Sequence, residues 1–332
     1  MSTRADVAKL AGVSESTVSY VLSGKRPISD DTKRRVQDAI DQLGYKANYA
    51  ATALAGGSPR MVTMMTANLF RTPPSQIDGA LIDGIVSGVQ SDGFHSVIWP
   101  ISNDDDSDVK MLLESNFSGG VILMGVTDND RRVQFLNQEK VPFLVLGRTN
   151  VGFEYHYVDR DFETVYLLAL EKLKEAGHKN VGVLSGSTEI NNYLKKAAKT
   201  HNLRLHLMTS KNNFQAGSEL AKVFKQAYPD VTAVISLLDL AVLGFVASCE
   251  ECGISIPKDL SIIGVNMLEE QAESAKPKIS TIAFDAYKMA ESCGKIMVEI
   301  IKADKGSTSK RSELWVGDFV DRGSISAPSV NS

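Results

Sequence analysis

The stretch "LAGVSESTVSYVLSGKRPIS", residues 10–29, contains two helix-like runs separated by a glycine, and a serine directly precedes the second run. Gly12 is suited to ending the first helix because glycine readily adopts the left-handed conformation found at helix C-termini. Ser14 is suited to capping the second helix, since its hydroxyl can accept a hydrogen bond from a free backbone amide of the first turn. The stretch therefore predicts a helix-turn-helix.

The flanking residues extend this pattern to three short helices. Thr3 and Asp6 have the spacing of a capping box at the start of the first helix. Ser29 and Gly44 mark the start and the end of a third helix. The apolar positions expected to form the shared core are Val7, Ala8, Ala11, Val18, Val21, Leu22, Val36, Ile40 and Leu43.

The outward face of the second helix is polar. Glu15, Ser16, Thr17 and Tyr20 lie at or near its N-terminus, which is the end that a recognition helix points at base edges in the major groove. We therefore predict that these four side chains read bases. The carboxylate of Glu15 has two open roles: it accepts a hydrogen bond from a cytosine amino group, or it only repels phosphate.

The distribution of charge supports contact with phosphate. Residues 1–60 carry nine lysines and arginines against six acidic residues, whereas the rest of the chain carries 27 against 34. Each basic side chain near the two helices is either a phosphate contact or a solvated surface charge. The predicted phosphate contacts are Ser14, Lys25, Arg26, Lys33 and Arg34.

Residues 6–57, "DVAKLAGVSESTVSYVLSGKRPISDDTKRRVQDAIDQLGYKANYAATALAGG", resemble the DNA-binding head and hinge of the LacI/GalR family of bacterial transcription regulators. The resemblance implies a helix-turn-helix domain over residues 1–46 and a hinge helix or linker over 47–58. It implies that Leu54 enters the minor groove as an apolar wedge and that Asn48 is a second minor-groove residue of the hinge, whereas the alternative for Leu54 is a plain apolar linker residue. A small helical domain that binds protein is the alternative for the whole head.

Two departures from the family pattern affect these expectations. Ala47 stands where a proline commonly precedes the hinge, so the start of the hinge is less preorganised. Tyr20 stands where many relatives carry an arginine suited to a bidentate contact with guanine, so the operator sequence cannot be transferred from relatives.

Beyond residues 56–59, "GGSP", short apolar runs alternate with amphipathic segments. This alternation predicts an α/β fold with parallel sheets covered by helices on both faces, and ligands at the carboxyl ends of the strands. The eight predicted strands are "MVTMMT" at 61, "SVIWP" at 96, "GVILMG" at 120, "PFLVLG" at 142, "NVGVLS" at 180, "TAVISL" at 232, "LSIIGV" at 260 and "KISTIAF" at 278.

The order of these segments, including "KLKEAGHKNVGVLSG" and "KPKISTIAF", is similar to the periplasmic-binding-protein-like core of the same family. The resemblance implies an effector-binding and dimerisation core over residues 59–332 with a cleft between two subdomains. Subdomain N is expected at about 60–158 and 285–312, and subdomain C at about 159–284 and 313–332. The family further implies a homodimer on a pseudo-palindromic operator of double-stranded DNA, and repression in preference to activation.

Motifs of enzymes and cofactor sites are absent from the sequence. It contains neither G-x-G-x-x-G after a strand nor a Walker A motif, and the five histidines are scattered. We predict no catalytic residue, no cofactor and no metal. A solute-binding transport protein and a sugar or nucleoside enzyme are the alternatives on the same core fold. No run of 18 apolar residues could span a membrane, and an odd count of three cysteines fits a reducing compartment, so we expect a cytoplasmic protein without membrane contact.

Cys249 and Cys252 have C-x-x-C spacing, which alone is a weak signal for zinc. On a helix these thiols share a face with Val242 and Phe245, so buried or interfacial thiols are favoured. The same apolar face is expected to contribute to the dimer interface.

The expected cleft departs from that of sugar-binding relatives. Positions that in those relatives offer an arginine, an asparagine and an aspartate correspond here to Ile190, Leu238 and Asn266. This change predicts an apolar wall with a few neutral donors, and hence an effector that is carbohydrate-derived but not a simple monosaccharide, or a regulator independent of any ligand. The candidate effector contacts are Asp159, Asn192, Phe214 and Asn266.

Overall fold

The structure is a computed structural model that describes residues 2–23, 26–45, 60–67, 76–101, 107–115, 117–303 and 309–329. The chain divides into two compact units, Met1–Arg60 with Ser115–Phe117, and Met61–Glu114 with Ser118–Ser332. The predicted hinge at 47–58, with Asn48 and Leu54, lies outside the described residues, as does Lys25.

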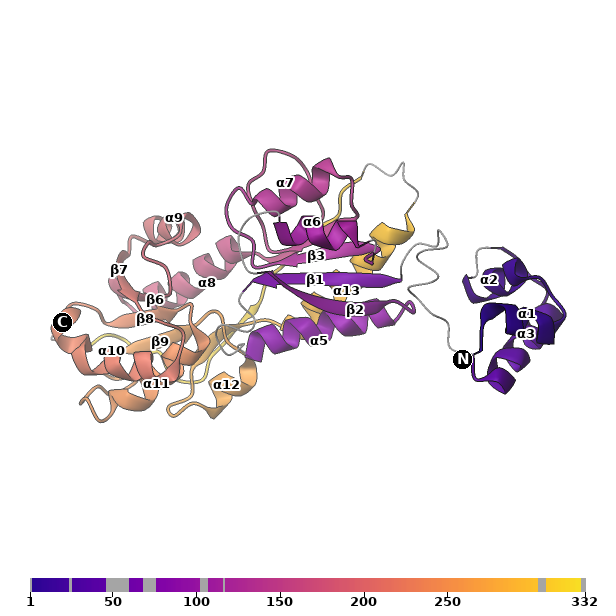
Figure 1. Ribbon diagram of the computed structural model, residues 1–332. Helices are drawn as coiled ribbons and strands as arrows, with labels where there is room; N and C mark the ends of the chain where they lie inside the picture. Colours follow the sequence, from indigo (N-terminus) through magenta and orange to yellow (C-terminus); the bar gives the residue numbers. More distant parts are fainter. Residues whose placement is uncertain are drawn as a thin grey trace. The chain divides into compact units, whose positions relative to one another are not determined.

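The first unit contains the three predicted helices, α1 (Arg4–Ala11), α2 (Glu15–Ser23) and α3 (Asp30–Leu43) (Figure 1). The capping box between Thr3 and Asp6 is confirmed, because each side chain bonds the other residue's backbone amide. Gly12 and Gly44 end α1 and α3 in the left-handed conformation, at φ 64° and 57°. The predicted helices are therefore confirmed, together with the residues predicted to cap α1 and α3.

The core of this unit is small and is formed by one face of each helix. Its buried members are Val7, Ala8, Ala11, Val18, Val36 and Ala39. The prediction that Leu22 points inward is wrong, since this residue is 38% exposed. Leu22 lies one turn beyond the fully buried Val18, at the end of a short helix, where it remains at the exposed edge of the buried face, whereas Val21 packs on the core.

The second unit contains two six-stranded sheets, each with its own helices, which we call the first and second lobes (Figure 1). The sheet of the first lobe is parallel throughout and has the order β11-β5-β4-β3-β1-β2. Its strands are β1 (Met61–Ala67), β2 (His95–Ile101), β3 (Gly120–Met124), β4 (Phe143–Leu146), β5 (Tyr157–Arg160) and β11 (Ser312–Trp315). Helices α5 (Gln76–Gln90) and α13 (Ala286–Lys302) cover one face, and α6 (Ser107–Glu114) and α7 (Arg131–Gln138) cover the other.

The sheet of the second lobe has the order β12-β10-β9-β8-β6-β7, in which only the pairing of β12 with β10 is antiparallel. Its strands are β6 (Asn180–Ser185), β7 (Arg204–Thr209), β8 (Ala233–Ser236), β9 (Ser261–Gly264), β10 (Ser280–Ala283) and β12 (Asp318–Val320). Helices α8 (Phe162–Glu175) and α9 (Asn192–His201) pack on one face. Helices α10 (Phe214–Ala227), α11 (Asp239–Cys249) and α12 (Glu269–Ser274) pack on the other.

All eight predicted strands are present, and the α/β prediction is confirmed. The chain passes between the lobes three times, after β5, after β10 and after β11. The sheets place Asp159 on β5 and residues 313–315 on β11, both in the first lobe, whereas the predicted boundaries assigned them to subdomain C. The observed boundaries differ from the predicted ones by a few residues because the chain crosses to the second lobe only after each of these two strands has ended.

Helix α11 is buried in the second lobe on the face that carries Val242 and Phe245, whereas Leu240 and Leu243 are half-buried and Ala247 is exposed. Val242 and Phe245 have no exposed surface, so the prediction that they form a dimer face is wrong. Gly217 and Gly244 allow α10 to approach α11 closely, because a Cβ atom at Gly217 would lie 1.8 Å from the carbonyl oxygen of Ala241. Burial also raises the pKa of the Cys249 thiol to about 12, which makes this thiol inert.

In the second lobe, the side chain of His178 is engaged by neighbouring hydroxyl groups. The imidazole of His178 lies 2.8 Å from the Thr232 hydroxyl and 3.0 Å from the Ser261 hydroxyl, so it has a structural role. Within the described ranges, no three His, Cys, Asp or Glu side chains are grouped to hold a metal ion. In the same part of the chain, no helix has the length and hydropathy needed to cross a membrane.

Candidate functional site

The N-terminus of α2 presents a cluster of hydroxyl groups. Ser14 Oγ accepts a hydrogen bond from the backbone amide of Thr17 at 3.1 Å, which confirms Ser14 as the cap. The same oxygen lies 2.7 Å from Ser16 Oγ and 2.9 Å from Thr17 Oγ1. These hydroxyls are thus oriented together at a helix end whose free amides and dipole favour a negatively charged partner.

Two charged contacts border this cluster. Arg4 Nε lies 3.6 Å from a carboxylate oxygen of Glu15, so an arginine of α1 offsets the negative charge at the start of α2. The guanidinium of Arg26 lies 5.0 Å from the centre of the Tyr20 ring, which is cation–π distance. The predicted base contact Tyr20 and the predicted phosphate contact Arg26 are therefore neighbours.

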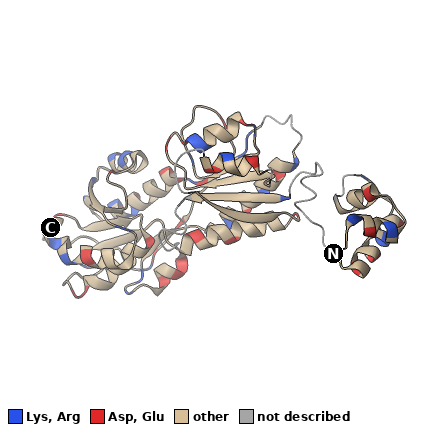
Figure 2. Cartoon of the chain, in the orientation of Figure 1, with Lys and Arg blue, Asp and Glu red and all other residues tan. Residues whose placement is uncertain are grey.

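The other two predicted phosphate contacts lie on α3 in exposed ion pairs. Lys33 pairs with Asp30 at 3.0 Å, and Arg34 pairs with Asp31 at 2.8 Å. Such surface pairs contribute about 0–1 kcal/mol, so phosphate oxygens can replace the aspartates at little cost. Acidic and basic residues are accordingly interspersed along the helices of the head (Figure 2).

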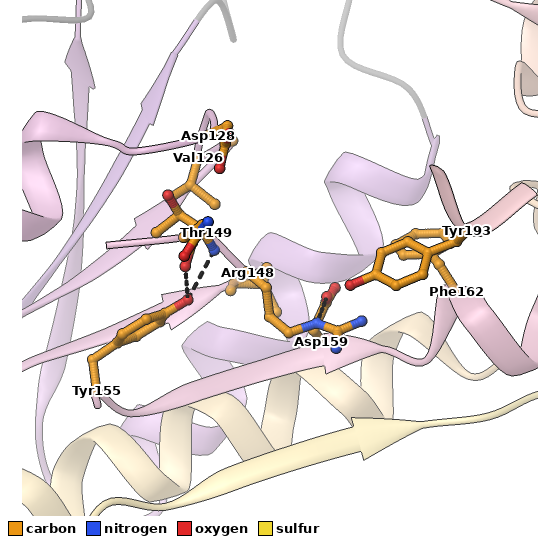
Figure 3. A pocket seen from close by; sticks show the side chains of 12 residues that line it. Val126, Asp128, Arg148, Thr149, Tyr155, Asp159, Phe162 and Tyr193 are labelled. Carbon is orange, nitrogen blue, oxygen red and sulfur yellow. Dashed lines mark hydrogen bonds and ion pairs between the residues drawn. The ribbon is translucent and has the colours of Figure 1, made fainter. Parts of the chain in front are cut away.

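A second candidate site is a pocket of about 640 Å³ in the other unit, formed by the loops that follow β3 and β4, the end of β5 and the first turns of α8 and α9 (Figure 3). This is the carboxyl end of the parallel strands, where ligands of such sheets bind. Its lining residues are Gly125, Val126, Asp128, Leu146, Gly147, Arg148, Thr149, Asn150, Tyr155, Asp159, Phe162 and Tyr193.

An ion pair occupies the middle of the pocket. Arg148 Nε donates to Asp159 Oδ2 at 2.8 Å, and Arg148 lies 5.7 Å from the Tyr193 ring (Figure 3). Burial raises the pKa of Asp159 although Arg148 opposes this change, and burial disfavours the charge of Arg148 although the pairing raises the pKa of this guanidinium overall. The pocket thus offers a fixed guanidinium and carboxylate side by side, which suits a ligand with several hydroxyl groups.

Aromatic side chains complete the walls of the pocket. The Tyr155 hydroxyl accepts from the Thr149 amide at 2.8 Å and donates to the Thr149 carbonyl at 2.7 Å, which fixes the loop after β4. Phe162 and Tyr193 lie together on the second lobe, beyond Arg148 as seen from Tyr155 (Figure 3). Rings on two sides provide flat apolar surfaces for a ligand.

Of the four predicted effector contacts, the pocket includes Asp159. Asn192 precedes the lining residue Tyr193 but is not part of the lining. Phe214 is 55% exposed at the start of α10, and the Asn266 amide lies 3.5 Å from the Leu237 carbonyl oxygen, so both lie outside the lining of this pocket. The wall predicted at Ile190, Leu238 and Asn266 is not part of this lining, which instead includes the charged residues Asp128, Arg148 and Asp159.

Comparison with known proteins identifies both units. Residues 3–48 match the family described as bacterial regulatory proteins, lacI family, and residues 170–325 match the periplasmic binding protein-like domain. The HTH-type transcriptional repressor PurR of Vibrio vulnificus (strain CMCP6) is 27% identical over 341 residues, covering 97% of this chain and 99% of the relative.

Solved structures agree on the fold. The lac repressor dimer bound to operator and the anti-inducer ONPF has a TM-score of 0.82 at 21% identity, covering 98% of this chain and 99% of that one. A complex of the transcriptional regulator CelR with cellobiose has a TM-score of 0.69 at 22% identity, covering 98% and 100%.

A helix-turn-helix head followed by a two-lobed α/β core with a pocket defines a DNA-binding transcription regulator. The chain thus combines a DNA-binding domain of the lacI family of bacterial regulatory proteins with a periplasmic binding protein-like domain, and its relatives include the repressor PurR.

Proposed function

We propose that this regulator is a cytoplasmic repressor, which binds a pseudo-palindromic operator as a homodimer and responds to a small molecule bound in the pocket. The observation that supports this proposal most strongly is the joint presence of the hydroxyl cluster at the N-terminus of α2 and the pocket at the strand ends. The first is suited to base edges and phosphate, and the second to an effector.

On the operator, the four polar side chains of α2 read bases in the major groove. Arg26, Lys33 and Arg34, together with Lys25 and the Ser14 cap, contact phosphates and fix the position of the helix. Leu54 and Asn48 of the hinge contact the minor groove near the centre of the site. Two-fold symmetry of the dimer then requires inverted half-sites.

The effector that fits this pocket is a neutral, polyhydroxylated molecule larger than a monosaccharide. Arg148 and Asp159 supply a donor and an acceptor side by side, and the three rings supply apolar faces. The volume of about 640 Å³ falls in the range of pockets that enclose drug-sized ligands. The cellobiose named for one structural neighbour is a disaccharide of this kind, which makes it the first compound to test.

The effector acts through a difference in affinity between two arrangements of the lobes. A ligand that prefers one arrangement shifts the equilibrium toward it, and a coupling of about 1–3 kcal/mol between pocket and operator is typical. The expected readout is therefore a change of operator affinity of about 5- to 150-fold.

Arg148→Gln is expected to abolish the effector's influence on operator affinity while leaving affinity without effector unchanged. The substitution removes the charge-assisted bonds of the guanidinium, each worth about 1.5–3 kcal/mol, but alters nothing in the head. Fluorescence anisotropy with a labelled operator, measured with and without cellobiose, other disaccharides and glucose, checks this result.

Arg131→Gln is the matched control, because Arg131 is an exposed residue at the start of α7 outside the pocket lining. An Arg148→Gln protein that responds to the same compounds as the wild type would exclude this pocket as the effector site.

A further inference from the structure

The guanidinium of Arg160 joins the two lobes. Arg160 is the last residue of β5 in the first lobe, and it is only 2% exposed. Its Nη1 donates to the carbonyl oxygen of Val265, directly after β9, and its Nη2 donates to that of Ile282 in β10 at 3.1 Å. One side chain therefore bonds two strands of the other sheet, 105 and 122 residues further along the chain.

All three crossovers of the chain lie near this guanidinium. Its centre is 3.7 Å from the ring of Phe284, which lies between β10 and α13, and 5.5 Å from the ring of Phe162, which begins α8. The backbone amide of Asp161, the next residue after Arg160, donates to the carbonyl of Trp315 at the end of β11 at 3.0 Å. The first, second and third passages between the lobes thus meet at one place.

No carboxylate of the described residues is hydrogen-bonded to the Arg160 guanidinium, whose hydrogen bonds go to two backbone carbonyls. Asp159 points to the opposite side of β5, where it pairs with Arg148, and Arg160 Nε is buried without a hydrogen-bond partner among the described atoms. Burial lowers the pKa of Arg160 to about 10, so the side chain still carries its charge at neutral pH. Two carbonyls and two rings stabilise this cation, and they do so only while both lobes keep their present arrangement.

The neighbours of Arg160 form the pocket. Asp159 and Phe162 flank it in sequence, and both line the pocket from different lobes. Phe162 stacks on Tyr166 with ring centres 5.7 Å apart, and the Tyr166 hydroxyl accepts from Asn191, the cap of α9, at 3.2 Å. Helix α9, which carries Tyr193, is therefore connected to the place near Arg160 where the three crossovers meet.

We propose that Arg160 is a positioning residue that fastens the two lobes at their crossovers and so sets the separation of the pocket walls. Its guanidinium acts on the ligand only through Asp159 and Phe162. The predicted effect on ligand binding rests on the proposed function. The contact between the lobes at Arg160 does not depend on effector or DNA.

Hydrogen–deuterium exchange of the free full-length protein tests the fastening without either ligand. In Arg160→Met, which keeps a long side chain but removes the charge and the donors, peptides covering residues 160–162, 264–266 and 281–285 are expected to exchange at least tenfold faster than in the wild type. The exchange rates of peptides from the centres of the sheets, such as β3 and β8, are expected to change far less, because the hydrogen bonds of these strands do not depend on Arg160.

Arg132→Met is the matched control. Arg132 is an equally buried arginine, but it is bonded entirely within the first lobe, to Asp130 and Gly125. This variant is expected to accelerate exchange near residues 125–133 and to leave the three crossover peptides as in the wild type.

Arg160→Lys decides the question if the methionine variant does not fold, since lysine keeps the charge but cannot bond both carbonyls while stacking on Phe284. It is expected to accelerate exchange at the same three peptides, by a smaller factor. Crossover peptides that exchange at the wild-type rate in the folded variants, or acceleration spread evenly over both lobes, would overturn the proposal. Failure of Arg148→Gln in the effector assay would leave this result unaffected, so the two proposals fail separately.

Discussion

Asp130→Ala is expected to lower the free energy of unfolding of the core by about 3–5 kcal/mol, because it leaves a buried arginine without its counter-charge. Arg132 is fully buried, and Asp130 is nearly so. The Asp130 carboxylate accepts from Arg132 Nε at 2.9 Å, from Arg132 Nη2 at 2.5 Å and from the Thr127 amide at 3.1 Å. These bonds keep the pKa of Asp130 low, although burial acts in the opposite direction.

The double variant Asp130→Ala/Arg132→Met separates the cost of an unpaired charge from the cost of lost packing. Removing both charges is expected to recover much of the stability, since replacing a buried ion pair by apolar groups is often close to neutral. Urea unfolding of the wild type, the single variant and the double variant gives the three free energies of unfolding, which are compared at equal slopes of free energy against urea concentration. A single variant that loses less than about 1 kcal/mol, or a double variant that is less stable than the single one, would show that the pair is not the source of the effect.

Ser16→Ala/Thr17→Ala is expected to weaken operator binding by about 1–3 kcal/mol for each lost base contact and to leave affinity for random DNA nearly unchanged. The helix itself should persist, because Ser14 caps the backbone amide of Thr17 and alanine favours helix. Titrations of operator and of random DNA at one salt concentration measure the two affinities.

The third helix offers a matched control for this variant. Ser29 caps α3 and its hydroxyl donates to the Thr32 hydroxyl at 2.9 Å, so Thr32→Ala removes an equivalent group from a helix that is not expected to read bases. Its operator affinity should stay close to that of the wild type. Equal losses on operator and random DNA in the α2 variant would count against base reading by Ser16 and Thr17.

The sequence predicted the elements whose signal is local. Buried strands such as β3 and β4 are apolar throughout, and the caps of α1 and α3 are recognisable from a few residues. Four strands were not predicted, namely β5, β7, β11 and β12. The last three lie at sheet edges, and all four include charged or polar residues, so their apolar signal is weak.

The pocket was only partly predictable for a related reason. Arg148 and Thr149 lie in the loop just after β4, and the rule that ligands bind at carboxyl ends of strands could have indicated them. Tyr193 required the position of α9, which depends on how the second lobe packs. The partners of Arg160 are distant in sequence and are backbone carbonyls, which leave no signal in residue type.

The central claim is that the head of this chain recognises one DNA sequence. Selection of bound fragments from genomic DNA by the purified full-length protein, followed by footprinting of the enriched sites, tests it most directly. The account predicts a single motif of two inverted half-sites, bound at least about 10³-fold more tightly than random DNA at the same salt concentration. Fragments enriched without a common motif, or a motif without inverted halves, would contradict it.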